Sequence, residues 1–333
     1  MTTGEGATRA ATPTSAFPTV DDVRAAARRL ERVVRRTPLE RSDGLSEISG
    51  TQVHLKLEGF QRTGSFKLRG AYNFIAGLAA EERARGLVTA SAGNHGQGVA
   101  LAARLLGARA VVFVPESAPD TKQRRIARQG AELRRVPGGY DDAHAAAEAF
   151  AAASGACFVH AFSDPAVVAG QGTVGLEIFD ELPDVRTLVV PVGGGGLIGG
   201  VGVVARALGD RVRVVGVQTE QTAAVHASLA AGALVSPPYG PTLCEGLSGD
   251  TDLRAVELAR RVVDEIVLVP EDAVRRAIRW LYVEEGLVAE GSAAVAAAAL
   301  LEGAVHPLDG PVAAVLTGSN LDAHRLARIL EER

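Results

Sequence analysis

Short, strand-like runs alternate with segments of helical length along most of this chain. The first half contains runs at residues 87–90, 110–114, 132–136 and 157–160, and the second half contains runs at residues 187–192, 213–217, 266–269 and 312–316. A strand that is apolar at nearly every position is buried on both faces, and a helix between consecutive strands allows them to run parallel. The alternation therefore predicts an α/β protein with two doubly wound parallel sheets.

The length of the chain agrees with two sheets in two domains. A single hydrophobic core stops growing at about 250–300 residues, and this chain has 333 residues, of which 47% are hydrophobic. We expect a small domain over residues 86–154 and a large domain built from residues 19–85 and 155–333. Residues 1–18 are rich in Thr, Ala, Gly and Pro, and we expect them to form a disordered tail.

Charge and cysteine content restrict the possible partners. The net charge is −4, with 35 basic residues mixed among 39 acidic ones, so the sequence indicates no surface for nucleic acid or an anionic membrane. Residues 1–18 lack the apolar core of a signal peptide. Cys157 and Cys244 show neither disulfide nor metal-binding spacing. We expect a cytoplasmic protein whose partner is a small molecule.

A run of four glycines follows the strand expected at residues 187–192 and precedes an apolar helical segment; the run and the next residue are Gly193, Gly194, Gly195, Gly196 and Leu197. The N–H groups of successive glycines can converge on an anion, and the start of the helix adds the positive end of its dipole. We interpret the loop as a phosphate cradle. Because Gly194, Gly196 and Gly199 also satisfy G-x-G-x-x-G, a nucleotide-binding oxidoreductase is an alternative from another class.

Two further motifs suggest what carries the phosphate. The amine of Lys67, in Ser65-Phe66-Lys67-Leu68-Arg69-Gly70-Ala71, is a candidate Schiff-base nucleophile. The loop Ser91-Ala92-Gly93-Asn94-His95-Gly96-Gln97-Gly98 lies between an expected strand and helix, where N–H groups bind a compact anion such as a carboxylate. Taken singly, these segments are more simply an exposed lysine and a capped loop. A phosphate-bearing aldehyde on Lys67 and an amino acid held at residues 91–95 would use all three motifs.

The ordered set of motifs resembles that of the threonine/serine dehydratases. It also includes Gly170-Gln171-Gly172-Thr173, Glu290-Gly291-Ser292-Ala293-Ala294 and Thr317-Gly318-Ser319-Asn320. These dehydratases are fold-type-II enzymes that use pyridoxal 5′-phosphate (PLP), and they are related to serine racemase, tryptophan synthase β and cysteine synthase. The resemblance covers the chain from about residue 20 to its C-terminus. It implies a tryptophan synthase β-like fold with the cofactor between the two domains.

The resemblance also implies roles for the matching residues. Lys67 would form the Schiff base with PLP and take the α-proton of the substrate, while Ser65 would protonate the departing β-hydroxyl or contact the phosphate. Phe66 would lie against the cofactor, Asn94 would bond its 3′-oxygen, and Thr317 would face its pyridine nitrogen. The phosphate would be bound by Gly193, Gly194, Gly195, Gly196 and Leu197. The substrate would be bound by Ser91, Ala92, Gly93, Asn94, His95 and Glu245.

The implied reaction is β-elimination, which converts L-threonine to 2-oxobutanoate, and L-serine to pyruvate, with release of ammonia. Ala92 replaces the serine that serves as the opposite base in serine racemase, so racemisation is disfavoured. Gln218 and Ala224 replace the acidic cation ligands of racemase-like members, so we expect no metal. Glu245 is one methylene longer than the aspartate of the family, which leaves a second alternative, a dehydratase of 3-hydroxyaspartate or of a hydroxyectoine-derived compound.

The resemblance bears on assembly and regulation as well. Related enzymes are commonly dimers or tetramers, so we expect a homo-oligomer. Biosynthetic threonine dehydratases carry an additional C-terminal sensor domain. Because only a short helix over residues 321–332 is expected after the last motif, we expect no C-terminal regulatory domain.

Overall fold

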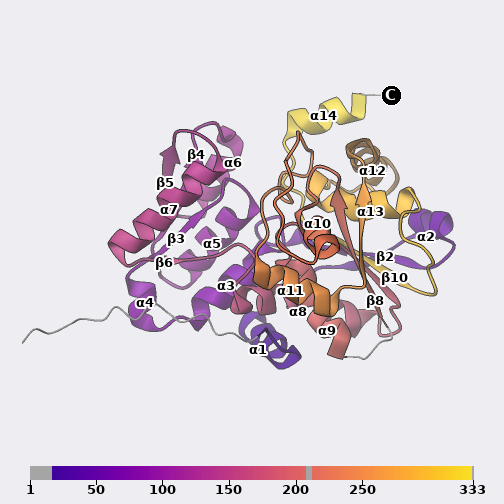
Figure 1. The fold of residues 1–333 in the computed structure, drawn as a ribbon, viewed down its shortest axis with the longest axis horizontal. Coiled ribbons are helices and arrows are strands. Elements are labelled where there is room, and N and C mark those ends of the chain that lie inside the picture. Colours follow the sequence, from indigo (N-terminus) through magenta and orange to yellow (C-terminus); the bar gives the residue numbers. More distant parts are fainter. Residues whose placement is uncertain (1–16, 208–211, 332–333) are drawn as a thin grey trace, which may run out of the picture.

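The computed structural model of this protein describes residues 17–207 and 212–331. Within them lie a six-stranded sheet, in the order β1-β2-β10-β7-β8-β9, and a four-stranded sheet, in the order β5-β4-β3-β6. Figure 1 shows two lobes, with the smaller sheet and its helices on the left and the larger sheet on the right. The α/β class with two sheets, predicted from the alternating runs, is confirmed.

The small lobe is a parallel sheet with helices packed against it. It comprises β3 (Leu87–Ala90), α5 (Asn94–Leu105), β4 (Ala110–Pro115), α6 (Asp120–Arg128), β5 (Glu132–Val136), α7 (Tyr140–Ser154) and β6 (Cys157–Phe158). Strand β6 pairs in parallel with β3, with Cys157 opposite Leu87. The domain boundary expected after residue 154 is therefore wrong by a few residues, because β6 completes the edge of the small sheet.

The large sheet has five parallel strands and one antiparallel edge. Its strands are β1 (Leu39–Ser42), β2 (Val53–Leu57), β7 (Thr187–Pro191), β8 (Arg213–Thr219), β9 (Glu265–Val269) and β10 (Val312–Leu316). Strand β1 pairs with β2 in the antiparallel direction. The sequence did not predict these two strands, because β1 is a polar edge strand and β2 contains Lys56, a lysine that is fully buried.

Helices cover both faces of the large sheet and join it to the small lobe. They are α1 (Val20–Leu30), α2 (Asp43–Ser49), the 3-10 turn η1 (Glu58–Phe60), α3 (Lys67–Gly77), α4 (Ala80–Ala84), α8 (Pro165–Glu181), α9 (Gly196–Ala207), α10 (Ala224–Ala231), α11 (Leu253–Val262), α12 (Glu271–Glu284), α13 (Gly291–Leu301) and α14 (Ala323–Glu331). None of the helices that the structure describes has a stretch of apolar residues that would span a bilayer.

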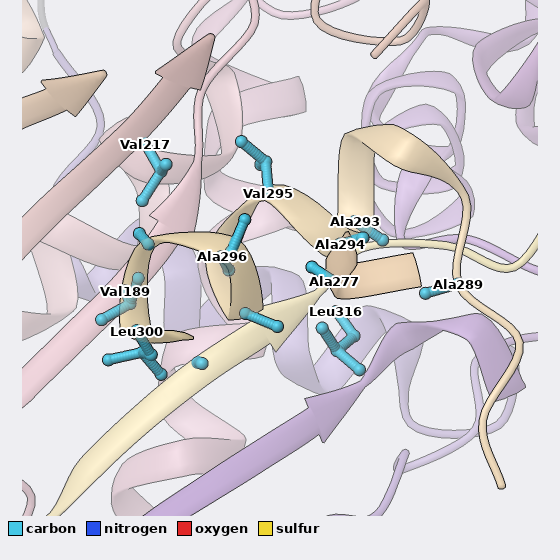
Figure 2. Close-up of a cluster of buried hydrophobic side chains, with 14 of the residues drawn as sticks. Val189, Val217, Ala277, Ala289, Ala293, Ala294, Val295, Ala296, Leu300 and Leu316 are labelled. Carbon is cyan, nitrogen blue, oxygen red and sulfur yellow. The ribbon is translucent and has the colours of Figure 1, made fainter. Parts of the chain in front are cut away.

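Helix α13 lies in the centre of the large lobe. Its residues from Gly291 to Leu300 are all buried, and most of their side chains are methyl groups. Figure 2 shows Ala296 and Leu300 of this helix beside Val189 of β7, within the cluster of buried side chains that also contains Leu316 of β10. The alanine-rich tract predicted to be a packed helix is therefore confirmed as one, and its small side chains allow it to lie close to the sheet.

The start of the described chain is fixed to the large lobe. Thr19 caps α1 in a reciprocal arrangement with Asp22, and the guanidinium of Arg261 lies 4.4 Å from the centre of the Phe17 ring. The disordered tail expected over residues 1–18 lies outside the described residues as far as residue 16. For Phe17 and Pro18 the expectation is corrected, because Phe17 packs against a cluster of buried side chains from α1, α8, α9 and α11.

Candidate active site

A cavity of about 710 Å³ lies between the two lobes. The small lobe contributes the first turns of α5 and α6, and the large lobe contributes the loops that follow β7 and β10 and the start of α13. The carboxyl ends of parallel strands are where open α/β sheets bind ligands. The cavity is lined by most of the predicted site residues: Phe66, Lys67, Ser91, Gly93, Asn94, His95, Gly193, Gly194, Gly195, Gly196, Leu197, Glu245 and Thr317.

Lys67 is the first residue of α3 and points into this cavity. Its Nζ donates a hydrogen bond to the carbonyl oxygen of Ala161 at 3.0 Å and lies 5.2 Å from the centre of the Phe66 ring. Burial lowers the pKa of Lys67 to about 8, and the nearby Glu290 opposes this effect. A lysine with a lowered pKa has a larger fraction of neutral amine near pH 7, which is the form that attacks an aldehyde.

Arg69, two residues after Lys67, fixes the start of α3. Its fully buried guanidinium lies between two carboxylates, with Nη2 2.7 Å from Oε1 of Glu58 and Nη1 2.7 Å from Oε1 of Glu177. Nζ of Lys56, in β2, lies 2.8 Å from Oε2 of the same Glu177. Sequence reasoning assigned no role to Arg69, because its partners come from elements that only the fold brings together. We call Lys56, Glu58, Arg69 and Glu177 the anchor cluster.

The glycine loop between β7 and α9 has the geometry of an anion cradle. Gly195 has φ of +95°, a conformation that side chains disfavour, and a Cβ at Gly194 would lie 2.4 Å from the Phe162 ring. Across residues 17–207 and 212–331, no acceptor is found for the N–H groups of Gly193, Gly194 and Gly195. All three glycines line the cavity, so their N–H groups are available to a bound phosphate.

The loop before α5 is shaped for a second anion. Gly93 occupies the cap position of α5 and supplies no side-chain hydrogen bond, so the first N–H groups of the helix are open to a ligand. The Oγ of Ser91 accepts a hydrogen bond from the N–H of Gly93 at 3.2 Å. Ala92 is not among the residues that line the cavity, so its predicted part in binding is limited to the shape of the loop.

The His95 side chain does not donate to a ligand. Its Nε2 lies 3.0 Å from the carbonyl oxygen of Val159, so this nitrogen carries the proton. Burial lowers the pKa of His95 to about 3, which leaves Nδ1 as an unprotonated acceptor. A carboxylate needs donors. Any contact between His95 and a substrate carboxylate is therefore made by the backbone N–H.

Glu290 was part of a motif in the sequence but had no predicted role. In the structure it lines the cavity, and its Oε1 accepts a hydrogen bond from Nδ2 of Asn94 at 2.5 Å. Burial raises the pKa of Glu290 to about 7, and the hydrogen bond from Asn94 opposes this effect. The site therefore contains a carboxyl group that changes charge near neutral pH. The only signal in the sequence was its place beside Gly291 and Ser292.

Glu245 lies at the mouth of the cavity, between the lobes. Its carboxylate pairs with Lys122 of α6 and with Nη1 of Arg325 of α14, the latter at 2.6 Å. Burial raises the pKa of Glu245, but the two cations outweigh burial and hold the pKa below its ordinary value. Glu245 lines the cavity, and its expected part in substrate binding stays a prediction for a carboxylate that already pairs with two cations. We call Lys122, Glu245 and Arg325 the mouth cluster.

Ser65 and Thr317 come from two segments that pair with each other, since Ser65 forms a β-bridge with Gly318. Ser65 is fully buried, and its Oγ has no hydrogen-bond partner in the described part of the chain. Its expected role, as a proton donor to the β-hydroxyl or a contact of the phosphate, stays a prediction. Thr317 does line the cavity, and its Oγ1 donates to the carbonyl oxygen of Ser292 at 3.3 Å.

Together these groups fit pyridoxal phosphate. The cradle supplies N–H donors for a phosphate, Lys67 supplies an amine of lowered pKa for an aldehyde, and Thr317 supplies a hydroxyl that can face a ring nitrogen. At the position where racemase-like members bind a cation, the side-chain amide of Gln218 donates a hydrogen bond to the carbonyl oxygen of Val192 and accepts one from the N–H of His226. The described residues contain no group of three or more His, Cys, Asp or Glu placed to hold a metal. The expected absence of a metal stays a prediction.

Comparisons with known proteins agree with this chemistry. Residues 30–318 match the family described as pyridoxal-phosphate dependent enzyme. The L-threonine ammonia-lyase of Thermotoga maritima is 45% identical, over 94% of this chain and 78% of its own length. Among solved structures, a maize serine racemase has a TM-score of 0.90 at 30% identity, over 94% of this chain and 97% of its own. A processed threonine deaminase isoform 2 from Solanum lycopersicum has a TM-score of 0.87 at 33% identity, over 94% and 90%.

Proposed function

This chain belongs to the pyridoxal-phosphate dependent enzymes and has their fold-type-II architecture, and from this premise we propose that it is a dehydratase of L-threonine and L-serine. The products are 2-oxobutanoate and pyruvate, respectively, with ammonia. The observation that carries the proposal is the amine of Lys67, which shares one cavity with a phosphate cradle and a second anion site. The nucleotide-binding oxidoreductase is set aside, because the glycine loop that suggested it lies inside the family match.

The cofactor is held by residues from both lobes. The N–H groups from Gly193 to Leu197 would bind its phosphate, Lys67 would bond its aldehyde carbon, and Asn94 would donate a hydrogen bond to its 3′-oxygen. Thr317 would offer a neutral hydroxyl to its pyridine nitrogen, which would favour prompt loss of the β-hydroxyl over transamination. When bound, PLP withdraws electrons from the α-carbon of the attached amino acid, so that the α-proton becomes removable.

Lys67 would also take the α-proton of the bound substrate. The lowered pKa of Lys67 places its proton affinity near the working pH, where a general base is most effective. The substrate carboxylate is bound at the first turn of α5, by the N–H groups there and the hydroxyl of Ser91. Since Ala92 offers no second base, the α-carbon is not reprotonated from the other face, and the β-hydroxyl leaves instead. Ser65, whose buried Oγ has no hydrogen-bond partner in the described residues, would donate a proton to that hydroxyl or a hydrogen bond to the phosphate.

The cations at the mouth favour a second candidate, dehydration of 3-hydroxyaspartate. Lys122, Arg125 and Arg325 line the cavity and would complement a distal carboxylate. The carboxylate of Glu245 already pairs with Lys122 and Arg325, which supports the neutral substrates over the acidic one.

Two measurements test the proposal. The purified protein should show visible absorbance from bound PLP, which Lys67→Ala should abolish and Lys122→Ala should preserve, although both lysines line the cavity. Release of 2-oxo acids from a panel of β-hydroxy amino acids should be fastest for threonine and serine. Turnover of 3-hydroxyaspartate without turnover of threonine or serine would establish the second candidate. A colourless protein that retains a nucleotide would overturn the PLP-dependent mechanism.

We propose a location and an assembly as well. The composition and cysteine spacing support a cytoplasmic enzyme. A homodimer or homotetramer is supported by the resemblance, because related enzymes are commonly dimers or tetramers. Light scattering coupled to size exclusion measures the assembly directly, and a mass of one 34.4 kDa chain would contradict it.

A further inference from the structure

Hydrogen bonds fix both ends of the Asn94 side-chain amide. Its Oδ1 accepts from Nδ2 of Asn320 at 2.7 Å, and its Nδ2 donates one hydrogen to Oε1 of Glu290 at 2.5 Å. An amide nitrogen carries two hydrogens. The second N–H of Asn94 is therefore left for another acceptor, and Asn94 lines the cavity that Lys67 enters.

The groups at the two ends of this chain of hydrogen bonds determine its direction. At one end, Nη1 of Arg125 donates to Oδ1 of Asn320 at 2.7 Å, and a guanidinium can only donate. The Asn320 amide must therefore present its nitrogen to Thr63 and to Asn94, and it bonds the Thr63 carbonyl at 2.9 Å. At the other end, an ionised carboxylate can only accept. A reversed Asn94 amide would place its oxygen against the carboxylate of Glu290.

We propose that Glu290 is a positioning residue for the reaction: it holds the Asn94 amide so that the second N–H, and not the carbonyl oxygen, faces the 3′-oxygen of PLP. This inference rests on the assignment of Asn94 to that oxygen under the proposed function. The opposite orientation would set two acceptors against each other and weaken binding of the cofactor.

The backbone around Glu290 keeps its carboxyl group in place. Glu290 caps the buried helix α13, whose positive end favours a carboxylate, and its N–H donates to the carbonyl oxygen of Gly318 at 3.2 Å. A Cβ at Gly318 would lie 2.5 Å from Oε1 of Glu290. The absence of a side chain at residue 318, next to Thr317, is therefore what allows the carboxyl group this close to the cofactor site.

The charge of Glu290 determines how strongly Glu290 fixes the orientation of the Asn94 side-chain amide. The charged groups that act on it are Lys67, Lys122, Arg125 and Glu245. A protonated carboxyl can donate as well as accept, so it no longer selects one orientation of the Asn94 amide, and only the donor from Asn320 still does. Because burial raises the pKa of Glu290 to about 7, the orientation is fixed from both ends above neutral pH and from the Asn320 end alone below it.

The test uses PLP binding in the absence of substrate, so its result does not depend on which amino acid the enzyme turns over. In the wild type, we expect the visible spectrum of bound PLP and its Kd to change with pH around 7. In Glu290→Gln the pH-dependent step should vanish and the Kd at pH 8 should rise about tenfold, the effect of one charge-assisted hydrogen bond. Glu290→Asp, which keeps a carboxylate, should retain a pH-dependent step.

Further variants separate positioning from a general loss of structure. Glu285→Gln is the matched control, because Glu285 accepts from Ser42 and does not line the cavity; it should behave as the wild type. Asn94→Ala should raise the Kd, and adding Glu290→Gln to it should cause little further loss, since Glu290 acts through Asn94. Arg125→Gln, at the far end of the chain, should show a weaker form of the Glu290→Gln effect.

Two results would overturn the inference. One is a pH-dependent step and a PLP Kd that Glu290→Gln leaves unchanged, and the other is full additivity of the Glu290→Gln and Asn94→Ala effects. If Glu290→Gln fails to fold, as circular dichroism would reveal, the Arg125→Gln and Glu290→Asp variants decide in its place: wild-type PLP binding in Arg125→Gln, or no pH-dependent step in Glu290→Asp, contradicts the proposal. Failure of threonine turnover with intact PLP binding contradicts the substrate assignment alone.

Discussion

The anchor cluster and the mouth cluster have similar chemistry and opposite surroundings. In the anchor cluster the side chains of Arg69 and Glu58 are completely buried, whereas in the mouth cluster Lys122 and Glu245 are 28% and 48% exposed. Removing one partner of a buried ion pair leaves an uncompensated charge, which costs about 3–5 kcal/mol. An exposed pair contributes about 0–1 kcal/mol. The difference teaches that the first cluster maintains the site, while the second can rearrange at little cost.

The largest expected effect is at the anchor cluster. Arg69→Met should lower the free energy of unfolding by about 3–5 kcal/mol, because the buried Glu58 would lose its cationic partner and Glu177 would keep only Lys56. Urea denaturation measures the change. Arg69→Lys, which keeps the charge and loses the paired hydrogen bonds, should fall between the wild type and Arg69→Met. A loss below 1 kcal/mol in Arg69→Met would remove the distinction between the clusters.

A smaller effect is expected at Lys67, for which the described residues provide no ion pair with a carboxylate. Burial lowers its pKa from 10.5 to about 8, so from pH 8 to 10.5 the unfolded chain binds more protons and stability rises with pH. In the cofactor-free protein at pH 7, Lys67→Met should therefore raise the free energy of unfolding by roughly 1–3 kcal/mol. The gain should shrink as the pH approaches 10.5.

Denaturation of both cofactor-free proteins at pH 7 and pH 10 tests this expectation. A Lys67→Met protein no more stable than the wild type at pH 7 would show that the protein tolerates the buried ammonium without cost. The same variant should be inactive, which separates stability from function.

The smallest effect on stability is expected at the mouth cluster. Glu245→Gln should change the free energy of unfolding by less than about 1 kcal/mol. It should instead alter KM, because it frees Lys122 and Arg325, and relative turnover of 3-hydroxyaspartate should rise. Added salt should narrow the KM difference from the wild type, since salt screens exposed charges. A loss of stability as large as that of Arg69→Met would show that the two clusters contribute equally to the free energy of unfolding.

The same contrast explains what the sequence could and could not predict. Strands such as β4, β7 and β10 were predicted because burial on both faces leaves a local apolar pattern. Strand β1 was missed because it is a polar edge strand, and β2 was missed because Lys56 interrupts its pattern and the partner of Lys56, Glu177, lies far along the chain. The glycine cradle and Lys67 were recognised as local motifs. The occupation of Glu245 by two cations was not predictable, since Lys122 and Arg325 come from distant helices.

The buried helix α13 limits which amino-acid substitutions this chain can accept. From Ala293 to Leu300 no side chain lines the cavity, yet every one is buried, and the helix begins directly after Glu290. A larger side chain at these positions would push the helix away from the sheet and move Glu290 with it. We therefore expect random mutagenesis to accept little beyond alanine, serine or glycine along residues 293–299 except at Val295. These positions contact no ligand, and geometry alone limits which residues they accept.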